Sequence, residues 1–335
     1  MFKVGIIGSG FMGATHATAW AQTLAQVAGI CSLDRASADA LAAQTGGRVY
    51  DNIDALLAAV DVVDICSPTH LHHEMALRAA AAGKHIICEK PLARTYAQAR
   101  EMVEACASAG VKLLVAHVVR FFPEYAQAKA IVERGEIGRV AVVRLTRCAY
   151  QPRLSANNWF LDPAKSGGLI LDLMIHDFDY ARWVAGDVVS VYARSVRGRQ
   201  PDAPEDYSLA ILRHADGALS NIEGAWAYPP PMFRTALEIA GDAGLIEHPA
   251  DSSVPLGIYL KASEAGGTPD VGLPMSPMLE DPYVAEIKHF YAVLTDEAVT
   301  PRVTAEDGAA ALRIALAASE SARTGRHVMI EEVLA

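Results

Sequence analysis

The chain has 335 residues, of which 52% are hydrophobic and 20% charged, so it is long enough and apolar enough to fold as two globular domains. Its formal net charge is -10 and its Lys and Arg residues are scattered, which argues against a nucleic-acid partner. The five cysteines form no CxxC pair and suit a reducing, cytoplasmic compartment. No apolar stretch is long enough to span a bilayer, and we expect neither a signal peptide nor a membrane partner.

The first part of the chain alternates between strand patterns and helical patterns. Helices are expected between strands at 2–7, 26–32, 48–50, 62–66, 84–88 and 112–116. Such alternation is typical of a doubly wound parallel sheet, the α/β class. Right-handed crossovers bring the carboxyl ends of all its strands to one edge, where ligands bind.

After residue 117 the pattern changes to strands that follow one another. They are expected at 139–151, 188–197, 206–213, 217–227 and 233–240. One helix, 165–185, interrupts this series, and further helices are expected at 123–134, 281–294 and 304–323. The pattern predicts an α+β domain with an open, mainly antiparallel sheet. We divide the chain into domains 1–120 and 121–335. An open sheet with an apolar outer face is usually covered by a second subunit, so we expect a homodimer or homotetramer.

Three glycines stand between the first strand and the first helix as Gly8-x-Gly10-x-x-Gly13. The first allows a tight turn, the second lets the backbone approach a pyrophosphate, and the third lets helix and strand pack closely. The motif occurs in the strand–turn–helix context that it requires. We therefore predict that residues 1–120 form a Rossmann domain that binds a dinucleotide, with Phe11 and Met12 beside the phosphates at the helix N-terminus.

The end of the second strand bears on the choice between NAD and NADP. Ser32 lies 19 residues after Gly13, where an NAD site usually carries an acid for the ribose hydroxyl. If Ser32 takes that place, Arg35 can balance a 2′-phosphate; if Asp34 reaches back instead, NAD fits. All three residues can also be ordinary polar side chains of a loop. The missing acid leads us to favour NADP.

Residues after the fourth strand lie at the same edge of the sheet. Ser67 and Pro68 can shape a turn beneath a nicotinamide, with His72 close by. His70, His72 and His73 suggest a metal site, but His72 and His73 point in different directions on a helix and no second cluster with ligand spacing follows. We therefore predict no metal.

The fifth strand ends at Glu89-Lys90-Pro91, which places Glu89 and Lys90 beside the nicotinamide crevice. An ammonium there can hydrogen-bond a substrate hydroxyl and stabilise a developing alkoxide. Without the dinucleotide motif, Lys90 would be interpreted as an ordinary exposed lysine at a strand end.

Asp172 and His176 are four residues apart, so one continuous helix would present both on one face, with Asp179 nearby. A carboxylate beside an imidazole is a general acid–base arrangement. Taken alone, the stretch is explained more simply as a buried helix with a capping Asp and a core His. A cofactor domain in the same chain favours the catalytic interpretation. Gly167 and Gly168 precede the helix and permit a sharp turn.

Arg120 at the domain junction, together with Asn158 and Trp159 before the helix, offers donors for hydroxyl groups and a flat apolar face. Such side chains bind polyols, although a purely structural role explains them equally well.

Together these motifs resemble the family of glucose–fructose oxidoreductase and inositol 2-dehydrogenase, the Gfo/Idh/MocA family. The resemblance covers nearly the whole chain and rests on the glycine motif, Ser67-Pro68 with His72, Glu89-Lys90-Pro91, Gly167 to His176, and Tyr283-x-x-Glu286. It implies a Rossmann domain, a second domain whose open sheet makes oligomer contacts, and a catalytic Lys, Asp and His that match Lys90, Asp172 and His176. It also implies a cis peptide bond before Pro91. Ser32 departs from the acid usual in NAD-preferring members.

The resemblance implies an NAD(P)-dependent oxidoreductase that moves hydride between nicotinamide and a secondary alcohol of a cyclic polyol or sugar. We expect His176 to take the hydroxyl proton, Lys90 to polarise the same oxygen and Asp172 to orient His176. Other hydroxyl groups would contact Arg120, Asn158, Trp159 and Asp179. Alternatives are a dihydrodiol dehydrogenase-like or imine-reducing enzyme on the same scaffold, or a non-catalytic dinucleotide sensor.

Overall fold

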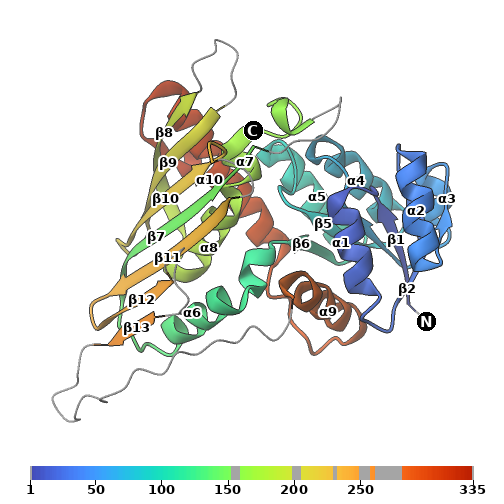
Figure 1. The fold of residues 1–335 in the computed structure, drawn as a ribbon, viewed down its shortest axis with the longest axis horizontal. Helices are drawn as coiled ribbons and strands as arrows, with labels where there is room; N and C mark the ends of the chain where they lie inside the picture. The colour runs from blue at the N-terminus through green and yellow to red at the C-terminus, as the bar shows by residue number, and fades with distance from the viewer. Residues whose placement is uncertain are drawn as a thin grey trace.

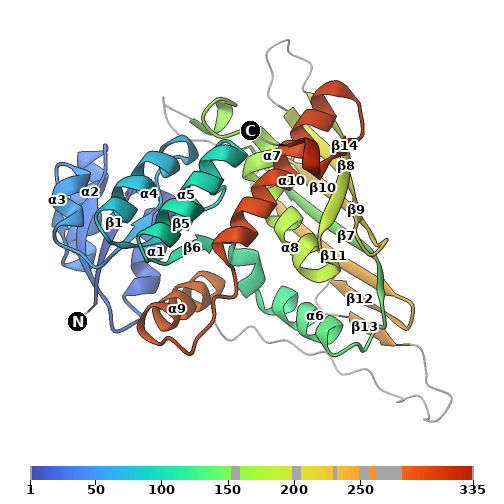
Figure 2. The same cartoon turned by 180° about the vertical axis from the view of Figure 1, so that it is seen from behind.

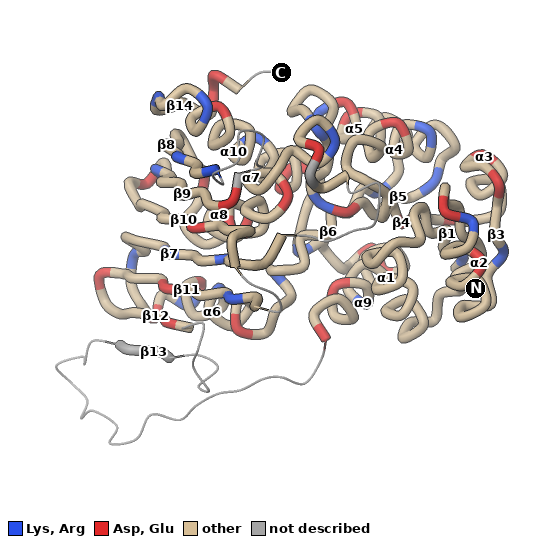
Figure 3. Tube along the Cα trace, turned by 45° about the horizontal axis from the view of Figure 1, so that its top comes forward, with Lys and Arg blue, Asp and Glu red and all other residues tan. Residues whose placement is uncertain are grey.

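The computed structural model of the chain describes residues 2–151, 159–197, 205–228, 232–248, 257–260 and 281–333. These residues form two sheets with helices packed against them (Figure 1). In the described part of the chain, no helix is both long enough and apolar enough to cross a membrane. Figure 3 shows Lys and Arg interspersed with Asp and Glu over both parts of the molecule.

The first sheet is a six-stranded parallel sheet in the order β3-β2-β1-β4-β5-β6, which confirms the expected Rossmann topology. Its strands are β1 (Lys3–Ile7), β2 (Gln26–Cys31), β3 (Arg48–Val49), β4 (Val62–Ile65), β5 (His85–Glu89) and β6 (Leu113–Ala116). Strands β4 and β6 are buried at every residue, as expected for parallel strands with helices on both faces.

Helices cover both faces of this sheet (Figure 2). On one face the core includes side chains of α3 (Ile53–Leu57), α4 (His72–Ala81) and α5 (Tyr96–Ser108). On the other face it includes side chains of α1 (Phe11–Trp20), α2 (Arg35–Thr45) and α9 (Pro282–Thr295). Helix α9 lies far along the chain, yet Ile287 and Phe290 bury their side chains in this core. Helix α9, which the division at residue 120 places in the second domain, thus packs against the first sheet.

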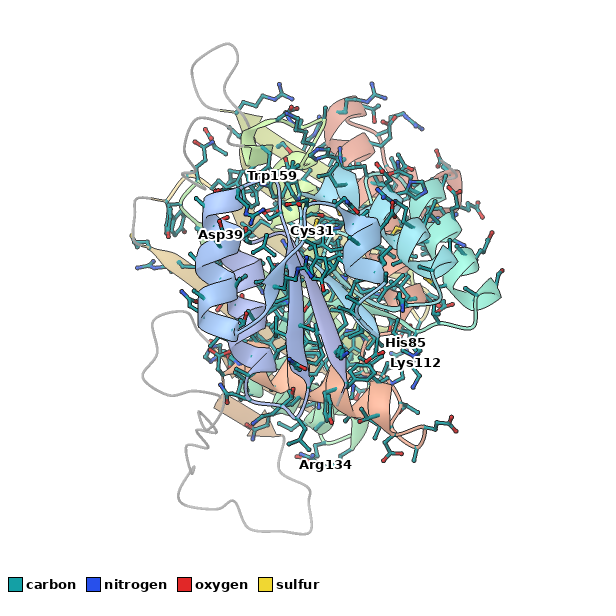
Figure 4. The ribbon with its side chains drawn as sticks, turned by 90° about the vertical axis from the view of Figure 1, so that its right-hand side faces the viewer. Cys31, Asp39, His85, Lys112, Arg134 and Trp159 are labelled. Atoms are coloured by element: carbon teal, nitrogen blue, oxygen red, sulfur yellow. The ribbon has the colours of Figure 1, made fainter. Side chains whose placement is uncertain are left out.

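The register of the parallel strands places their carboxyl ends along one edge. Ile7 of β1 pairs with Ile65 of β4, and Glu89 of β5 pairs with Ala116 of β6. Figure 4 shows Cys31, the last residue of β2, toward the same edge of the molecule as Trp159, whereas His85 and Lys112 lie toward the opposite edge. Trp159 is thus on the side of the sheet where a dinucleotide is expected.

The second sheet has eight strands in the order β13-β12-β11-β7-β10-β9-β8-β14. Strands β7 and β10 pair in parallel and the other neighbours are antiparallel, so the expected open, mainly antiparallel sheet is confirmed. The strands are β7 (Val140–Ala149), β8 (Val188–Arg197), β9 (Glu205–His214), β10 (Leu219–Ala225), β11 (Phe233–Gly241), β12 (Gly244–His248), β13 (Gly257–Leu260) and β14 (Val328–Met329).

One face of the second sheet is covered by helices that lie between it and the first sheet (Figure 1). They are α6 (Pro123–Glu133), α8 (Ile175–Ala185) and α10 (Ala305–Thr324), with the short α7 (Gly168–Asp172) at their end. The opposite face carries no described helix. Several of its large apolar side chains are exposed, among them Tyr192, Leu209 and Ile211.

The expected single helix over 165–185 is wrong, because the chain breaks at Leu173 and Met174 into α7 and α8. Gly167 and Gly168 precede α7 with φ values of +89° and +72°, which supply the sharp turn that the sequence predicted. Met174 packs directly on the backbone of β10, since a Cβ atom added to Gly224 would lie 2.3 Å from Met174 Cγ. This tertiary contact is made at the break between α7 and α8.

Candidate active site

The glycine motif forms the turn between β1 and α1 in the way the sequence predicts. Gly8 has φ +101°, a left-handed conformation that favours glycine. A Cβ atom on Gly13 would lie 2.0 Å from the carbonyl oxygen of Gly8, so α1 packs against the turn at this point. A Cβ atom on Gly10 would meet no heavy atom within 4 Å. The space beside Gly10 therefore fits the approach of a pyrophosphate, with Phe11 exposed and Met12 half-buried at the start of α1.

Three carboxylates lie near the end of β2, where the ribose of the cofactor is expected. Asp34 caps α2, its Oδ1 accepting the N–H of Ser37 at 3.1 Å. The guanidinium of Arg35 is exposed and forms ion pairs with Asp39 at 2.9 Å and Asp51 at 2.8 Å. The charge expected to balance a 2′-phosphate is thus already paired with two carboxylates. Ser32 is half-buried at the end of the strand.

His72 is a structural brace between two loops. Its ring is 1% exposed, with Nδ1 2.9 Å from the carbonyl oxygen of Pro91 and Nε2 2.8 Å from that of Ser67. Burial lowers the pKa of His72. Both ring nitrogens face main-chain oxygens of the loops after β4 and β5, so a direct cofactor contact from His72 is not supported by this geometry. The Lys90–Pro91 bond, which these loops enclose, is cis, as the family resemblance implies.

Lys90 and Asp172 meet across the two parts of the molecule. Lys90 Nζ donates to the main-chain oxygen of Asp172 at 2.7 Å and lies 3.2 Å from its Oδ1. Both side chains are largely buried, 16% and 10% exposed. An ammonium has three N–H groups, so one remains for a substrate oxygen. The sequence placed these two residues in one site, and the structure brings them into direct contact.

The structure gives no hydrogen bond between His176 and Asp172 in the described part of the chain. The break at Leu173 and Met174 places the two residues in different helices, α7 and α8, so the spacing expected within one continuous helix does not apply to them. Nδ1 of His176 is buried without a hydrogen-bond partner among the described residues. Burial, together with the positive charges of Lys90 and Arg147, lowers the pKa of His176 well below its usual value. The imidazole is therefore neutral and able to accept a proton.

Arg120 and Asp179 are both buried in a bidentate ion pair. Arg120 Nε donates to Asp179 Oδ2 at 2.8 Å and Arg120 Nη2 to Oδ1 at 2.6 Å, and each side chain is 1% exposed. Arg120 also donates to the main-chain oxygen of Arg302 at 2.8 Å. The pair ties the short helix over Val118–Phe121 to α8. Direct contacts with substrate, which we expected from both residues, are not supported by this geometry.

The remaining expected substrate contacts lie in the loop before α7. Trp159 is half-buried and its ring stacks on Phe160, with the centroids 4.0 Å apart. Asn158 lies outside the described residues. Arg94, after β5, holds this loop by donating to the main-chain oxygen of Pro163 at 2.8 Å.

Sequence reasoning missed a buried charge network behind Lys90. His16 Nδ1 lies 3.0 Å from both carboxylate oxygens of Asp64, and Trp20 Nε1 donates to Asp64 at 2.8 Å. His16 Nε2 is 3.3 Å from Glu89 Oε1, whose other oxygen accepts the backbone N–H of Lys90 at 2.9 Å. Burial opposes the charged imidazole, but Asp64 outweighs it and the pKa of His16 is raised well above its usual value. Glu89 thus positions the backbone of Lys90. The sequence signal for this network was Asp64, a single acidic residue within the otherwise apolar strand β4.

Cys66 adjoins this network without making it a convincing metal site. Cys66 Sγ lies 3.4 Å from His16 Nδ1 and from Asp64 Oδ1, so three donor types gather there. Burial raises the pKa of the Cys66 thiol, so the thiol is present as a hydrogen-bonding S–H group. The hydrogen bonds account for the short distances, and we assign no metal here.

Glu286, from the late motif, is also part of this buried region. Its side chain is fully buried, and neither carboxyl oxygen has a hydrogen-bond partner among the described residues. Burial raises its pKa well above the usual value. Burial thus favours the protonated, uncharged form of the carboxyl group.

Comparisons with known proteins agree with this arrangement. A family model described as an oxidoreductase family with an NAD-binding Rossmann fold matches residues 2–117, and the GFO/IDH/MocA C-terminal domain matches residues 125–247. Myo-inositol 2-dehydrogenase of Thermotoga maritima is 32% identical over 82% of this chain and 81% of its own. 1,5-Anhydro-D-fructose reductase of Ensifer adhaerens is 29% identical over 99% of both chains. The structure of levoglucosan dehydrogenase with NADH and levoglucosan matches with a TM-score of 0.87 at 27% identity, over 98% of this chain and 99% of that one. The chain therefore belongs to the Gfo/Idh/MocA family and is an NAD(P)-dependent dehydrogenase or reductase.

Proposed function

We propose that the protein transfers hydride between NAD and a secondary alcohol, or the matching ketone, of a cyclic polyol or sugar. The observation that carries the proposal is the position of the Lys90 ammonium. It is held by Asp172 at the carboxyl edge of the first sheet, with one N–H free for a substrate oxygen. NAD bound along this edge would supply the nicotinamide C4 that accepts the hydride.

The residues of the chain divide the remaining work. Lys90 donates a hydrogen bond to the reacting oxygen and stabilises the alkoxide that develops there. His176, neutral because of its burial, takes the hydroxyl proton. Asp172 holds the ammonium of Lys90, a role that replaces the orientation of His176 assigned to it from sequence.

We also propose NAD, in place of NADP, as the preferred cofactor. Arg35 is engaged by Asp39 and Asp51, and Asp34 adds a third carboxylate at the same strand end. Three acids oppose a 2′-phosphate, while Oδ2 of Asp34 can still accept a ribose hydroxyl. The levoglucosan dehydrogenase relative is described with NADH. A kcat/KM with NADP more than about tenfold above that with NAD, a difference of about 1.4 kcal/mol, would overturn this choice.

The substrate class is tested by following absorbance at 340 nm with a panel of compounds. Myo-inositol and levoglucosan serve for oxidation and 1,5-anhydro-D-fructose for reduction, each with both cofactors. We expect turnover with at least one cyclic polyol or sugar. Cofactor binding by calorimetry without turnover of any polyol or sugar would overturn the proposal. Reduction confined to cyclic imines, or oxidation confined to dihydrodiols, would assign the site to those reactions instead.

A further inference from the structure

His117 lies beside the site and has no role in the mechanism above. It follows Ala116, the last residue of β6, which pairs with Glu89 of β5. Lys90 follows Glu89 in the same way. His117 and Lys90 therefore lie next to each other beyond the ends of neighbouring strands, which are about 5 Å apart in a sheet.

The ring of His117 is completely buried, yet neither nitrogen has a hydrogen-bond partner among the described residues. A buried polar atom without a partner costs about 1–3 kcal/mol, so an arrangement that supplies partners in the working enzyme is expected. Nδ1 lies 3.9 Å from Asp179 Oδ2, about 1 Å beyond hydrogen-bond distance. Asp179 itself is fixed by the two hydrogen bonds from Arg120.

Helix α8 presents a second unpartnered imidazole to the same region. His176 and Asp179 are three residues apart on α8, so they lie one turn from each other on neighbouring parts of its surface. Nδ1 of His176, like both ring nitrogens of His117, is buried without a hydrogen-bond partner in the described part of the chain. A positive charge on His117 would lower the pKa of His176.

We propose that His117 is a positioning residue for His176. In the holoenzyme, the Nδ1–H of His117 donates to Asp179, and Nε2 of His117 accepts the Nδ1–H of His176. The Nε2 lone pair of His176 then faces the substrate hydroxyl and takes its proton. The network accounts for all three unpartnered nitrogens. In this network Asp179, acting through His117, fixes the orientation of the His176 ring, a role that the sequence analysis assigned to Asp172.

The charges around the pair fit this role. Asp179, Arg120, Lys90 and Glu89 act on His117, and burial lowers its pKa. A neutral His117 has one N–H and one lone pair, as the network requires. When His176 becomes an imidazolium, the hydrogen bond to His117 and the Asp179 carboxylate behind it stabilise the new charge. The inference rests on the proposed function, because it assigns His176 as the base.

Three substitutions of His117 separate positioning from packing. His117→Phe keeps the volume and removes both hydrogen-bonding atoms. The amide of His117→Asn reaches the place of Nδ1 and keeps only the link to Asp179, while that of His117→Gln reaches the place of Nε2 and keeps the acceptor for His176. We expect kcat to fall about 10- to 100-fold in the Phe and Asn variants, in the range of a weakened general base. The Gln variant should recover much of this loss.

The pH profile gives a readout that a packing defect would not move. The pKa of the base in kcat against pH should fall in His117→Phe, because the imidazolium of His176 loses its acceptor. KM for NAD should change less than about twofold. His85→Gln, at the opposite edge of the sheet (Figure 4), is the matched control and should leave the profile unaltered. Equal losses in all three His117 variants with an unshifted profile would overturn the proposal.

A test without turnover keeps this inference separate from the proposed function. Ring ¹⁵N NMR of histidine-labelled enzyme with bound NAD reports the tautomer of each imidazole, and His176→Gln identifies the His176 signals. We expect the Nδ1–H tautomer at His176, shifting to a mixture in His117→Phe. An Nε2–H tautomer at His176 in the wild-type enzyme would refute the positioning role, whatever the substrate panel shows. Failure of the panel alongside the expected tautomer would refute only the proposed substrate class.

Discussion

Two glycines of the turn between β1 and α1 should respond to substitution in opposite ways. A Cβ atom on Gly10 would meet nothing within 4 Å, and its φ of -72° suits any residue. A Cβ atom on Gly13 would lie 2.0 Å from the carbonyl oxygen of Gly8. Gly10→Val should therefore leave the fold intact and block the dinucleotide, whereas Gly13→Ala should damage the fold itself.

The size of each effect follows from these contacts. Real Cβ atoms essentially never approach another heavy atom within 3.0 Å, so in Gly13→Ala the helix or the turn must move by about 1 Å. Overpacking of this kind costs about 1–3 kcal/mol or more, and backbone on both sides of the contact favours the upper end. The melting temperature should fall by several degrees. In Gly10→Val the branched side chain fills the space for the pyrophosphate, and Kd for NAD should rise at least tenfold, or about 1.4 kcal/mol.

Scanning fluorimetry measures the melting temperatures, and calorimetry measures the affinity for NAD. Gly10→Ala serves as the graded control, because its single methyl group should weaken binding less than Val does. Unchanged affinity in a folded Gly10→Val protein would refute the pyrophosphate site. A melting temperature of Gly13→Ala equal to that of the wild type would refute the packing argument for the third glycine.

The other predictions concern catalysis, pH and assembly. Lys90→Ala and His176→Ala should each lower kcat by about two to four orders of magnitude at saturating NAD. The loss in the double variant should be far smaller than the product of the two single losses, because both residues serve one proton transfer. A steady-state rate near that of the wild type for either single variant would contradict this assignment. Glu286 has a raised pKa in the folded protein and titrates near 4.3 when unfolded, so it opposes folding increasingly as the pH rises above about 4. Glu286→Gln should accordingly raise the melting temperature at pH 8 and have little effect near pH 4, and a difference independent of pH would contradict the assignment. We propose that the open face of the second sheet pairs with another copy of the chain, so that Leu209→Lys with Ile211→Lys reduces the mass in light scattering; a monomeric wild-type protein at micromolar concentration would exclude this.

Features that depend on neighbouring residues could be predicted from the sequence. The alternation of strands and helices up to Ala116 and the glycine motif specify a parallel sheet with a dinucleotide turn, because burial and backbone conformation act over a few residues. The position of Lys90 followed as well, since a residue just after a parallel strand must lie at the ligand edge.

The pairing of charged side chains was decided only by tertiary structure. The spacing of Asp172 and His176 predicts a pair only if the helix is continuous, and Met174 packing on Gly224 of β10 accompanies a break that spacing cannot reveal. Asp172 meets Lys90 instead, 82 residues away in the sequence.

The same holds for buried polar groups and for the return of the chain to the first domain. Asp64 finds His16 on α1, and α9 packs beside them because its apolar face fits the core around Trp20. A buried charge must have a partner, but sequence does not identify that partner, since any segment of the chain can supply it. Which groups form a site across two domains is determined by the packing of helices on sheets, a property of the whole fold.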